Sequence, residues 1–144
     1  MDENVEIKSD IETEVKNVFR KEISCFRDDD ITISNEANRV VHIKYNSQPL
    51  STSPYNPTEI DLYFCLDTKY TWISSLHVAA SFRSIGIGRQ LVHAAEETAR
   101  SMDFKNICVF PLQSSKSFWE KLGYRVHYCT HRALSKTLTN TDYS

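Results

Sequence analysis

The sequence predicts a single α/β domain, built as a mixed sheet of about six strands with helices on both faces. Three observations lead to this fold class. Short strand patterns fill much of the first half of the chain, an amphipathic helix pattern over 87–102 joins two apolar strand patterns, and 144 residues suit one hydrophobic core. Strand, helix and strand over 71–112 form a βαβ unit, which is right-handed by default. We expect one domain over residues 1–144, frayed from about residue 139.

The N-terminal segment predicts a short strand followed by a helix. Residues 4–8 alternate in polarity, which is typical of a strand. Ser9 and Glu12 form a capping box, so a helix is expected to begin near Asp10 and to end at the aspartates 28–30. Apolar residues at helical spacing indicate that this helix packs on one side: Ile11, Val15, Val18, Phe19, Ile23 and Phe26.

Four further strand patterns predict antiparallel pairs. Residues 31–33 and 39–45 flank one turn, and residues 60–66 and 71–78 flank another. The segment 46–57 between the two pairs contains three prolines and predicts a loop.

The C-terminal third predicts a buried strand, a short helix and two more strands. Residues 107–112 are continuously apolar, as expected of a strand covered on both faces. A helix over 115–122 is closed by Gly123, which stands just past its end, where glycine is favoured. Strands are then expected over 124–129 and 132–138.

Composition and charge exclude several classes of function. The net charge is −2 and no block rich in lysine or arginine occurs, which argues against a nucleic-acid partner. No apolar run reaches the roughly 18 residues of a membrane span and no signal peptide opens the chain, so we expect a cytoplasmic protein without a membrane partner. The four cysteines allow two disulfides, but they form no CxxC pair. Free thiols in a reducing compartment are expected, because Cys108 lies in a strand predicted to be buried.

Two of the three glycines, Gly86 and Gly88, stand one residue apart between a strand and a helix. Glycine permits a positive φ and a close approach of the backbone to a ligand. A helix that begins just after such a turn directs unpaired N–H groups toward the same point. The turn and the helix start together predict an anion site, most plausibly for phosphate. A tight turn that binds nothing is the alternative that the local pattern leaves open.

Two common phosphate-binding designs do not fit the glycine pair. A dinucleotide site of the GxGxxG type needs a third glycine where Leu91 stands. A P-loop needs a Gly-Lys-Ser/Thr ending, and Arg89 and Gln90 follow the second glycine instead.

The chain resembles a third design. Residues 83–88, Arg-Ser-Ile-Gly-Ile-Gly, match the (Gln/Arg)-x-x-Gly-x-(Gly/Ala) signature of the GCN5-related N-acetyltransferase (GNAT) superfamily. Leu76-x-Val78 matches the strand before that signature, and residues 118–124 are similar to a helix ending that comes later in the family. The resemblance is firmest over 58–128 and implies the GNAT fold with acetyl-CoA as acyl donor.

The resemblance also implies which residues bind acetyl-CoA. In this family backbone amides hold the pyrophosphate, which implies the segment 84–89 here, and the pantetheine arm pairs like an extra strand with the backbone of 76–78. Such pairing requires this strand and the next one to diverge, since only then are backbone groups left for a ligand. The implied cofactor-binding residues are Leu76, His77, Val78, Arg83, Ser84, Ile85, Gly86, Ile87, Gly88 and Arg89.

The usual catalytic side chains are missing from the matching positions. Relatives place a Glu or His base where Trp72 and Ser74 stand, and a Tyr acid where Trp119 stands. An indole does not exchange a proton in this way, so core packing is the simpler interpretation of Trp119. The catalytic candidates that remain are Tyr124 and Ser74, with Glu59 and Asp61 on the neighbouring strand as candidates for a water chain.

A metal site is not expected. His127, Cys129 and His131 alternate and would share one strand face, but no fourth zinc ligand is evident. His42 and His93 carry no sign of a partner in the sequence.

These features predict a transferase, namely an N-acetyltransferase that moves an acetyl group directly from acetyl-CoA to a primary amine of a small molecule or peptide. The loss of both usual catalytic side chains favours the alternative, a sensor or regulatory module that binds acetyl-CoA with little or no catalysis. A third option is an interaction domain on a relic fold, which would bind no coenzyme A. Relatives wall the acceptor site with two helices between their first two strands, and this chain has room for one. The resemblance therefore implies an acceptor pocket that is shallow, or is built by the loop 46–57 or by the partner chain of a homodimer.

Overall fold

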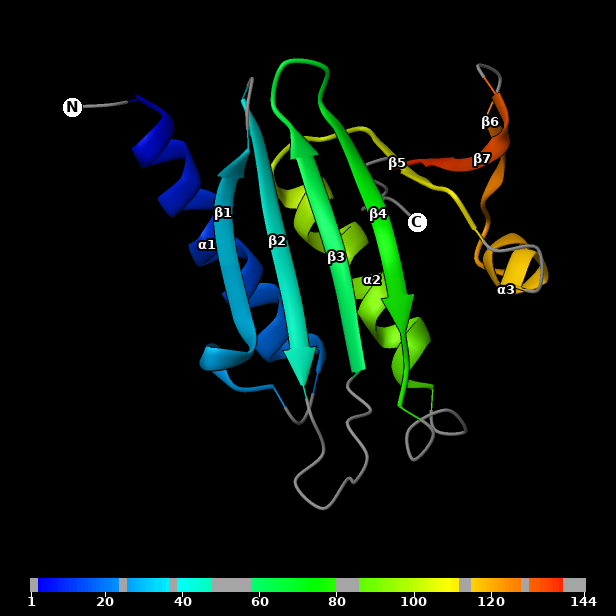
Figure 1. The fold of residues 1–144 in the computed structure, drawn as a ribbon, viewed down its shortest axis with the longest axis horizontal. Helices are drawn as coiled ribbons and strands as arrows, with labels where there is room; N and C mark the ends of the chain where they lie inside the picture. The colour runs from blue at the N-terminus through cyan, green and yellow to red at the C-terminus, as the bar shows by residue number, and fades with distance from the viewer. Residues whose placement is uncertain are drawn as a thin grey trace, which may run out of the picture.

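The computed structural model describes residues 3–23, 26–36, 39–47, 58–79, 86–111, 115–127 and 130–138, and four consecutive strands lie between its two long helices (Figure 1). In chain order the elements are α1 (Glu3–Glu22), the 3-10 turn η1 (Asp28–Asp30), β1 (Ile31–Glu36), β2 (Val40–Ser47), β3 (Thr58–Cys65), β4 (Tyr70–His77), α2 (Ile87–Ser101), β5 (Asn106–Val109), α3 (Lys116–Lys121), β6 (Arg125–His127) and β7 (Thr130–Thr137).

The described strands form one seven-stranded sheet in the order β1-β2-β3-β4-β5-β7-β6. Every neighbouring pair is antiparallel except β4 and β5, which are parallel. The predicted number of about six strands is corrected to seven, because β6 and β7 both join the sheet, with β7 lying between β5 and β6.

The start of α1 corrects the prediction for the N-terminal segment. α1 begins at Glu3, so the strand predicted over 4–8 and the helix start predicted near Asp10 are both wrong. Ile7 stands one helical turn before Ile11, whose side chain is fully buried, and this spacing extends the apolar stripe toward the N-terminus. The alternating polarity of residues 4–8 extends over only five residues, so it is weaker evidence for a strand than the longer apolar stripe is for a helix.

α1 also ends earlier than predicted, at Glu22 instead of at the aspartates 28–30. The aspartates form η1, in which Asp30 is buried and its carboxylate accepts a hydrogen bond from the Arg27 backbone N–H at 3.2 Å. η1 therefore leads the chain into β1 and is a separate turn.

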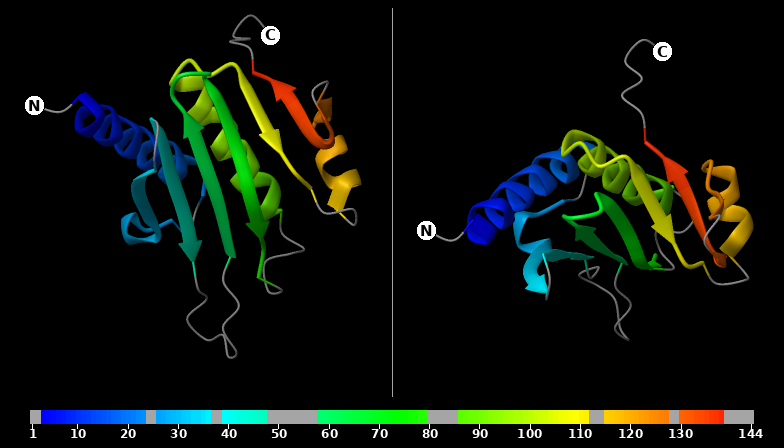
Figure 2. Two further views of the ribbon diagram at one scale, coloured as in Figure 1. Left: turned by 45° about the horizontal axis from the view of Figure 1, so that its top comes forward. Right: turned by 90° about the horizontal axis from the view of Figure 1, so that it is seen from above.

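α1 and α2 lie side by side on one face of strands β1–β4 (Figures 1 and 2). Side chains on that face of β2 and β3 are buried at every second position: Val41, Ile43, Tyr45, Ile60, Leu62 and Phe64. No described helix covers the opposite face of β1–β4. We call this uncovered side the open face; it carries the side chains of His42, Lys44, Glu59, Asp61, Tyr63 and Ser75.

β4 and β5 pair over only four residues, from Tyr70 opposite Asn106 to Ile73 opposite Val109. β4 continues to His77, and the two strands diverge beyond the paired region (Figure 2). The divergence that a strand-like pantetheine arm requires is therefore present. β5 is shorter than the predicted strand over 107–112, although its last three residues are buried as expected.

The remaining predictions at the C-terminus hold in part. α3, β6 and β7 follow the predicted order, while Cys129 and the tail from residue 139 lie outside the described residues. Cys108 is buried, as expected of this strand, and Cys65 is half-buried with a free thiol. In the described ranges, no helix combines the length and the apolar character needed to cross a membrane.

Candidate functional site

The turn that opens α2 has the backbone shape predicted for an anion site. Gly86 is the N-cap residue of α2 and has a φ of 83°, in the left-handed region that favours glycine. No described atom lies within 4 Å of the position that a Cβ of Gly86 would occupy. Gly86 has no side chain, so it provides no side-chain cap for the amides at the start of α2.

The second glycine serves packing. A Cβ at Gly88 would lie 3.3 Å from Val78 Cγ2 and 3.7 Å from Phe118 Cζ. The first of these distances is tighter than an ordinary contact, so a larger residue would push α2 away from the end of β4. Gly88 thus brings together the three segments that carry the sequence resemblance, around Val78, Gly88 and Phe118.

The structure describes seven of the ten predicted cofactor residues. Leu76 and Val78 are half-buried, while His77 is exposed and stands opposite Glu59 of β3. Ile87 is buried beside Gly88, and Arg89 is exposed on the first turn of α2. The other three, Arg83, Ser84 and Ile85, lie outside the described residues.

Trp72 and Trp119 pack against other aromatic rings. The Trp72 ring stacks on Phe110, with centroids 5.1 Å apart and an angle of 12° between the ring planes. Trp119 is buried and meets the ring of Tyr124 edge-on at 5.3 Å. The packing role predicted for Trp119 is therefore confirmed, and neither residue is placed to transfer a proton.

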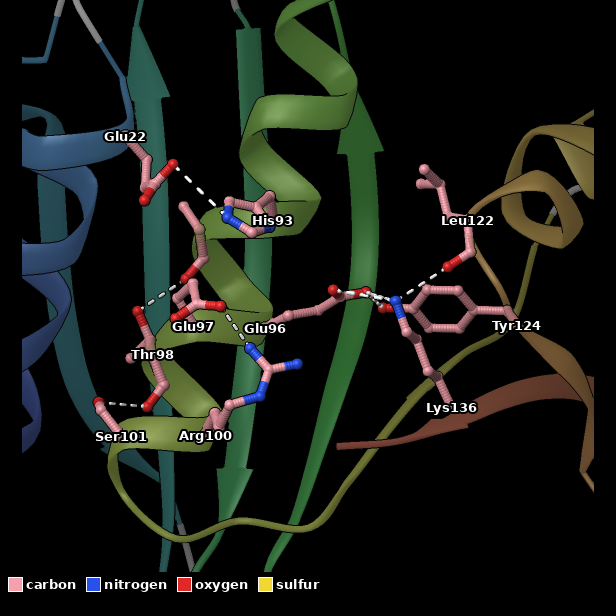
Figure 3. Close-up of polar contacts among 11 residues, drawn as sticks. Glu22, His93, Glu96, Glu97, Thr98, Arg100, Ser101, Leu122, Tyr124 and Lys136 are labelled. Atoms are coloured by element: carbon pink, nitrogen blue, oxygen red, sulfur yellow. Dashed lines mark hydrogen bonds and ion pairs between the residues drawn. The ribbon is translucent and has the colours of Figure 1, made fainter. Parts of the chain in front are cut away.

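Tyr124 is locked in a buried polar cluster between α2 and β7 (Figure 3). Its side chain is fully buried, and its hydroxyl donates a hydrogen bond to Glu96 Oε2 at 2.8 Å. Lys136 Nζ lies 3.2 Å from both carboxylate oxygens of Glu96 and donates to the Leu122 carbonyl at 2.9 Å. Burial and then the Glu96 carboxylate raise the pKa of Tyr124 far above its ordinary value. The structure therefore shows Tyr124 packed and hydrogen-bonded, while its role as the acid stays a prediction.

A hollow of about 400 Å³ runs along α2 from its first turn. Arg89 and His93 line it from α2, together with Lys136 of β7. His93 Nε2 lies 3.7 Å from Glu22 Oε1 of α1 (Figure 3). Cations and carboxylates alternate along this lining, so the hollow has no net preference for one charge and we assign it no ligand.

A bulge interrupts β4 on the side of β3. Asp61 pairs with Ser75 and Leu62 pairs with Ile73, so Ser74 has no partner on β3. Ser74 is exposed, as is its neighbour Ser75. Bulges redirect side chains and are frequent beside active sites. This one lies just after the point where β4 and β5 cease to pair.

The bulge completes a three-residue cluster that sequence reasoning missed. Ser75 Oγ donates to Asp61 Oδ2 at 2.7 Å, and His42 Nε2 lies 2.7 Å from Asp61 Oδ1. The sequence offered Asp61 as a candidate but gave His42 no partner. Only the register of β2, β3 and β4 could have indicated that these three side chains meet. The bulge in β4 shifts that register by one residue, so the sequence does not reveal it.

The absence of a metal site stays a prediction. No group of three His, Cys, Asp or Glu side chains is arranged there to hold a metal ion. Cys129 is outside the described residues, and the side chains of His127 and His131 are not described.

Comparison with known proteins identifies the family. A family model described as the acetyltransferase (GNAT) family matches residues 6–124, so the chain belongs to the GNAT family and is an acyltransferase by class. A search of curated proteins finds no significant match.

Solved structures share the fold at low sequence identity. GCN5 from Tetrahymena is 9% identical with a TM-score of 0.57, and the match covers 91% of this chain and 88% of that one. An acetyltransferase from Bacillus cereus is 18% identical with a TM-score of 0.55, covering 85% and 86%. The PaiA N-acetyltransferase from Thermoplasma acidophilum, solved with coenzyme A, is 14% identical with a TM-score of 0.51, covering 69% and 61%.

Proposed function

We propose that the protein is an acetyl-CoA-dependent N-acetyltransferase that moves an acetyl group directly to a primary amine of a small molecule or peptide. Membership of the GNAT family supports the proposal. The observation that carries it is the start of α2, where Gly86 has a φ of 83° beside open space and Gly88 packs against the end of β4. Such a backbone suits a pyrophosphate, because amides can reach it with no side chain in between.

The described residues fit acetyl-CoA in two places. The backbone amides of 87–89 would hold the pyrophosphate at the positive end of α2. The backbone of 76–78, where β4 has left β5, would hold the pantetheine arm. Arg83, Ser84 and Ile85 belong to the same proposal from the sequence resemblance, although they lie outside the described residues.

The reaction makes two demands on the protein. Acetyl-CoA, when bound, supplies a thioester carbonyl that an amine can attack. A primary alkylammonium has a pKa near 10, so on the order of one molecule in a thousand is unprotonated at neutral pH. The chain must therefore orient the acceptor beside the donor and also take up a proton from it.

A sensor that binds acetyl-CoA without transferring the acetyl group is the second candidate. Trp72 and Trp119 favour it, because both stand where relatives carry catalytic side chains and both are held in aromatic contacts. A sensor would need the same turn at Gly86 and would release no thiol.

Calorimetry and thiol release test both candidates. We expect the wild-type protein to bind acetyl-CoA and a folded Gly86→Glu variant to lose that binding, because the new carboxylate would meet the pyrophosphate. Unchanged affinity in the folded variant removes the site assignment. Thiol release is then measured against a panel of primary amines, and the absence of release above background identifies the sensor.

A cytoplasmic location and a homodimer stay predictions. Sedimentation of the purified protein with and without acetyl-CoA measures its oligomeric state. Fractionation of cells that express the full chain checks its location.

A further inference from the structure

The open face carries one group of side chains that the proposed function does not use, namely His42, Asp61 and Ser75. Each of the three comes from a different strand, β2, β3 and β4, and Asp61 joins the other two through hydrogen bonds of 2.7 Å. Ser75 stands next to Leu76, which begins the segment proposed to hold the pantetheine arm. The cluster therefore lies beside the segment that we propose to hold the pantetheine arm.

The order of the three residues excludes a serine nucleophile. A nucleophilic serine gives its proton to an imidazole, and the carboxylate stands behind that imidazole. Here the carboxylate of Asp61 stands in the middle, and Ser75 donates to it directly. Ser75 is thus a support for Asp61, which leaves His42 as the end of the cluster that can accept a proton.

The contacts of His42 settle its protonation pattern. An ionised carboxylate can only accept hydrogen bonds, so Nε2 carries a hydrogen and donates it to Asp61. The lone pair of the neutral ring is therefore on Nδ1. The ring also stacks on Tyr63, with centroids 4.4 Å apart and planes 7° apart, and its side chain is 21% exposed. The imidazole is held in one orientation while remaining in reach of water.

Charged and polar groups surround His42 on the open face. The Asp61 side chain, which is 15% exposed, contacts Nε2. Lys44, the next residue on the open face of β2, lies with its Nζ 3.7 Å from Glu59 Oε2, so its charge is matched there. Tyr63 faces the ring from β3 as a neutral phenol, and Ser34 stands opposite His42 on β1.

We propose that His42 is the group that accepts the proton of the acceptor amine, and that Asp61 is the residue that positions it. This inference rests on the proposed acetyl transfer. The ammonium loses a proton to His42 Nδ1, directly or across one water, and the freed lone pair attacks the thioester carbonyl. A C–N bond forms and the C–S bond breaks. The nitrogen, which still carries two hydrogens and a positive charge after the attack, releases its second proton through water to the leaving thiolate. The imidazolium then returns its proton to water.

Two kinds of amine separate this role from a structural one. A primary alkylamine is almost fully protonated at neutral pH, whereas hydroxylamine is largely unprotonated and needs little help from a base. General bases typically contribute about 10²–10⁴-fold to a rate, so we expect His42→Gln to lower kcat for an alkylamine from the panel by about 100-fold or more. The rate with hydroxylamine and the KM for acetyl-CoA should change little. Without the base, kcat/KM of His42→Gln for the alkylamine should rise with pH toward the pKa of the amine, near 10, because only the free amine then reacts.

Asp61→Asn keeps the shape of the cluster and removes the negative charge. We expect it to lower kcat for the alkylamine without raising the KM for acetyl-CoA. His93→Gln replaces an exposed histidine of α2 and is the matched control, with unchanged rates. Equal losses with the alkylamine and hydroxylamine, or an undiminished alkylamine rate in folded His42→Gln, overturn this inference alone. A wild-type protein that binds acetyl-CoA but transfers to no amine overturns the proposed function and this inference with it.

Discussion

Gly86 and Gly123 both have a positive φ. Comparing substitutions at the two positions separates the contribution of the turn before α2 to ligand binding from its contribution to stability. Gly86 has a φ of 83° and Gly123 has a φ of 99°. A left-handed backbone costs a residue with a side chain about 1–2 kcal/mol. An added methyl group would meet no described atom within 4 Å at Gly86, and at Gly123 its nearest neighbour is Lys136 Cε at 3.5 Å, an ordinary contact. Neither alanine clashes, so backbone strain sets the cost at both positions.

Gly86→Ala and Gly123→Ala should therefore lose similar stability and differ in binding. A loss of about 1–2 kcal/mol lowers the Tm of a domain of this size by about 3–8 °C. At Gly86 the methyl group also projects into the open space proposed for the pyrophosphate, and we expect the affinity for acetyl-CoA to fall by about tenfold or more, or about 1.4 kcal/mol. Gly123→Ala should bind acetyl-CoA like the wild type.

Thermal melts and titration calorimetry measure the two effects separately. The reasoning is refuted if folded Gly86→Ala binds acetyl-CoA with wild-type affinity. It is equally refuted if Gly123→Ala loses as much affinity as Gly86→Ala, because binding would then follow general stability and not the turn.

The buried cluster around Tyr124 yields three further predictions. Tyr124→Phe removes the hydrogen bond to Glu96 and should lower the free energy of unfolding by about 1–2 kcal/mol. Thiol release should be unchanged, and lost activity in the folded variant would instead indicate that Tyr124 is the acid. Burial raises the pKa of Tyr124 in the folded protein. The neutral phenol therefore contributes its full stabilisation below about pH 10, near the ordinary pKa of tyrosine. Above that pH the free energy of unfolding of the wild type should fall by up to about 1.4 kcal/mol per pH unit. Urea unfolding at several alkaline pH values checks this fall, and an equally steep decline in Tyr124→Phe would contradict it. Lys136→Met leaves the Glu96 carboxylate without its cation and should lower the free energy of unfolding by about 2–3 kcal/mol in chemical denaturation. The loss is smaller than for a fully buried pair because the Lys136 side chain is 29% exposed. No measurable loss would contradict the pairing.

The parts of the site that depend on local backbone chemistry were predictable from the sequence. Gly86 and Gly88 stand where a strand meets a helix, and the physics of that junction is contained in a few consecutive residues. The packing of Trp119 was predictable for the same reason, since an indole in the middle of a short amphipathic helix favours the core.

The link between His42 and Asp61 could not be predicted in this way. It depends on the alignment of three strands, and the bulge at Ser74 shifts that alignment by one residue. Nothing in the residues near Ser74 marks the shift, because two serines in a row fit a regular strand equally well. The strand predicted over 4–8 failed for a related reason, since five residues of alternation weigh less than a helical stripe that extends over several turns.

The short pairing between β4 and β5 affects how the protein can acquire a new acceptor by substitution. Among the described residues, only four pairs join β4 to β5, so β1–β4 and the C-terminal strands are weakly coupled through the sheet. Substitutions in β1–β3 that suit a new acceptor would therefore disturb β5 and β7 little. A catalytic histidine on β2, far from the usual position, is the kind of solution that such independence permits.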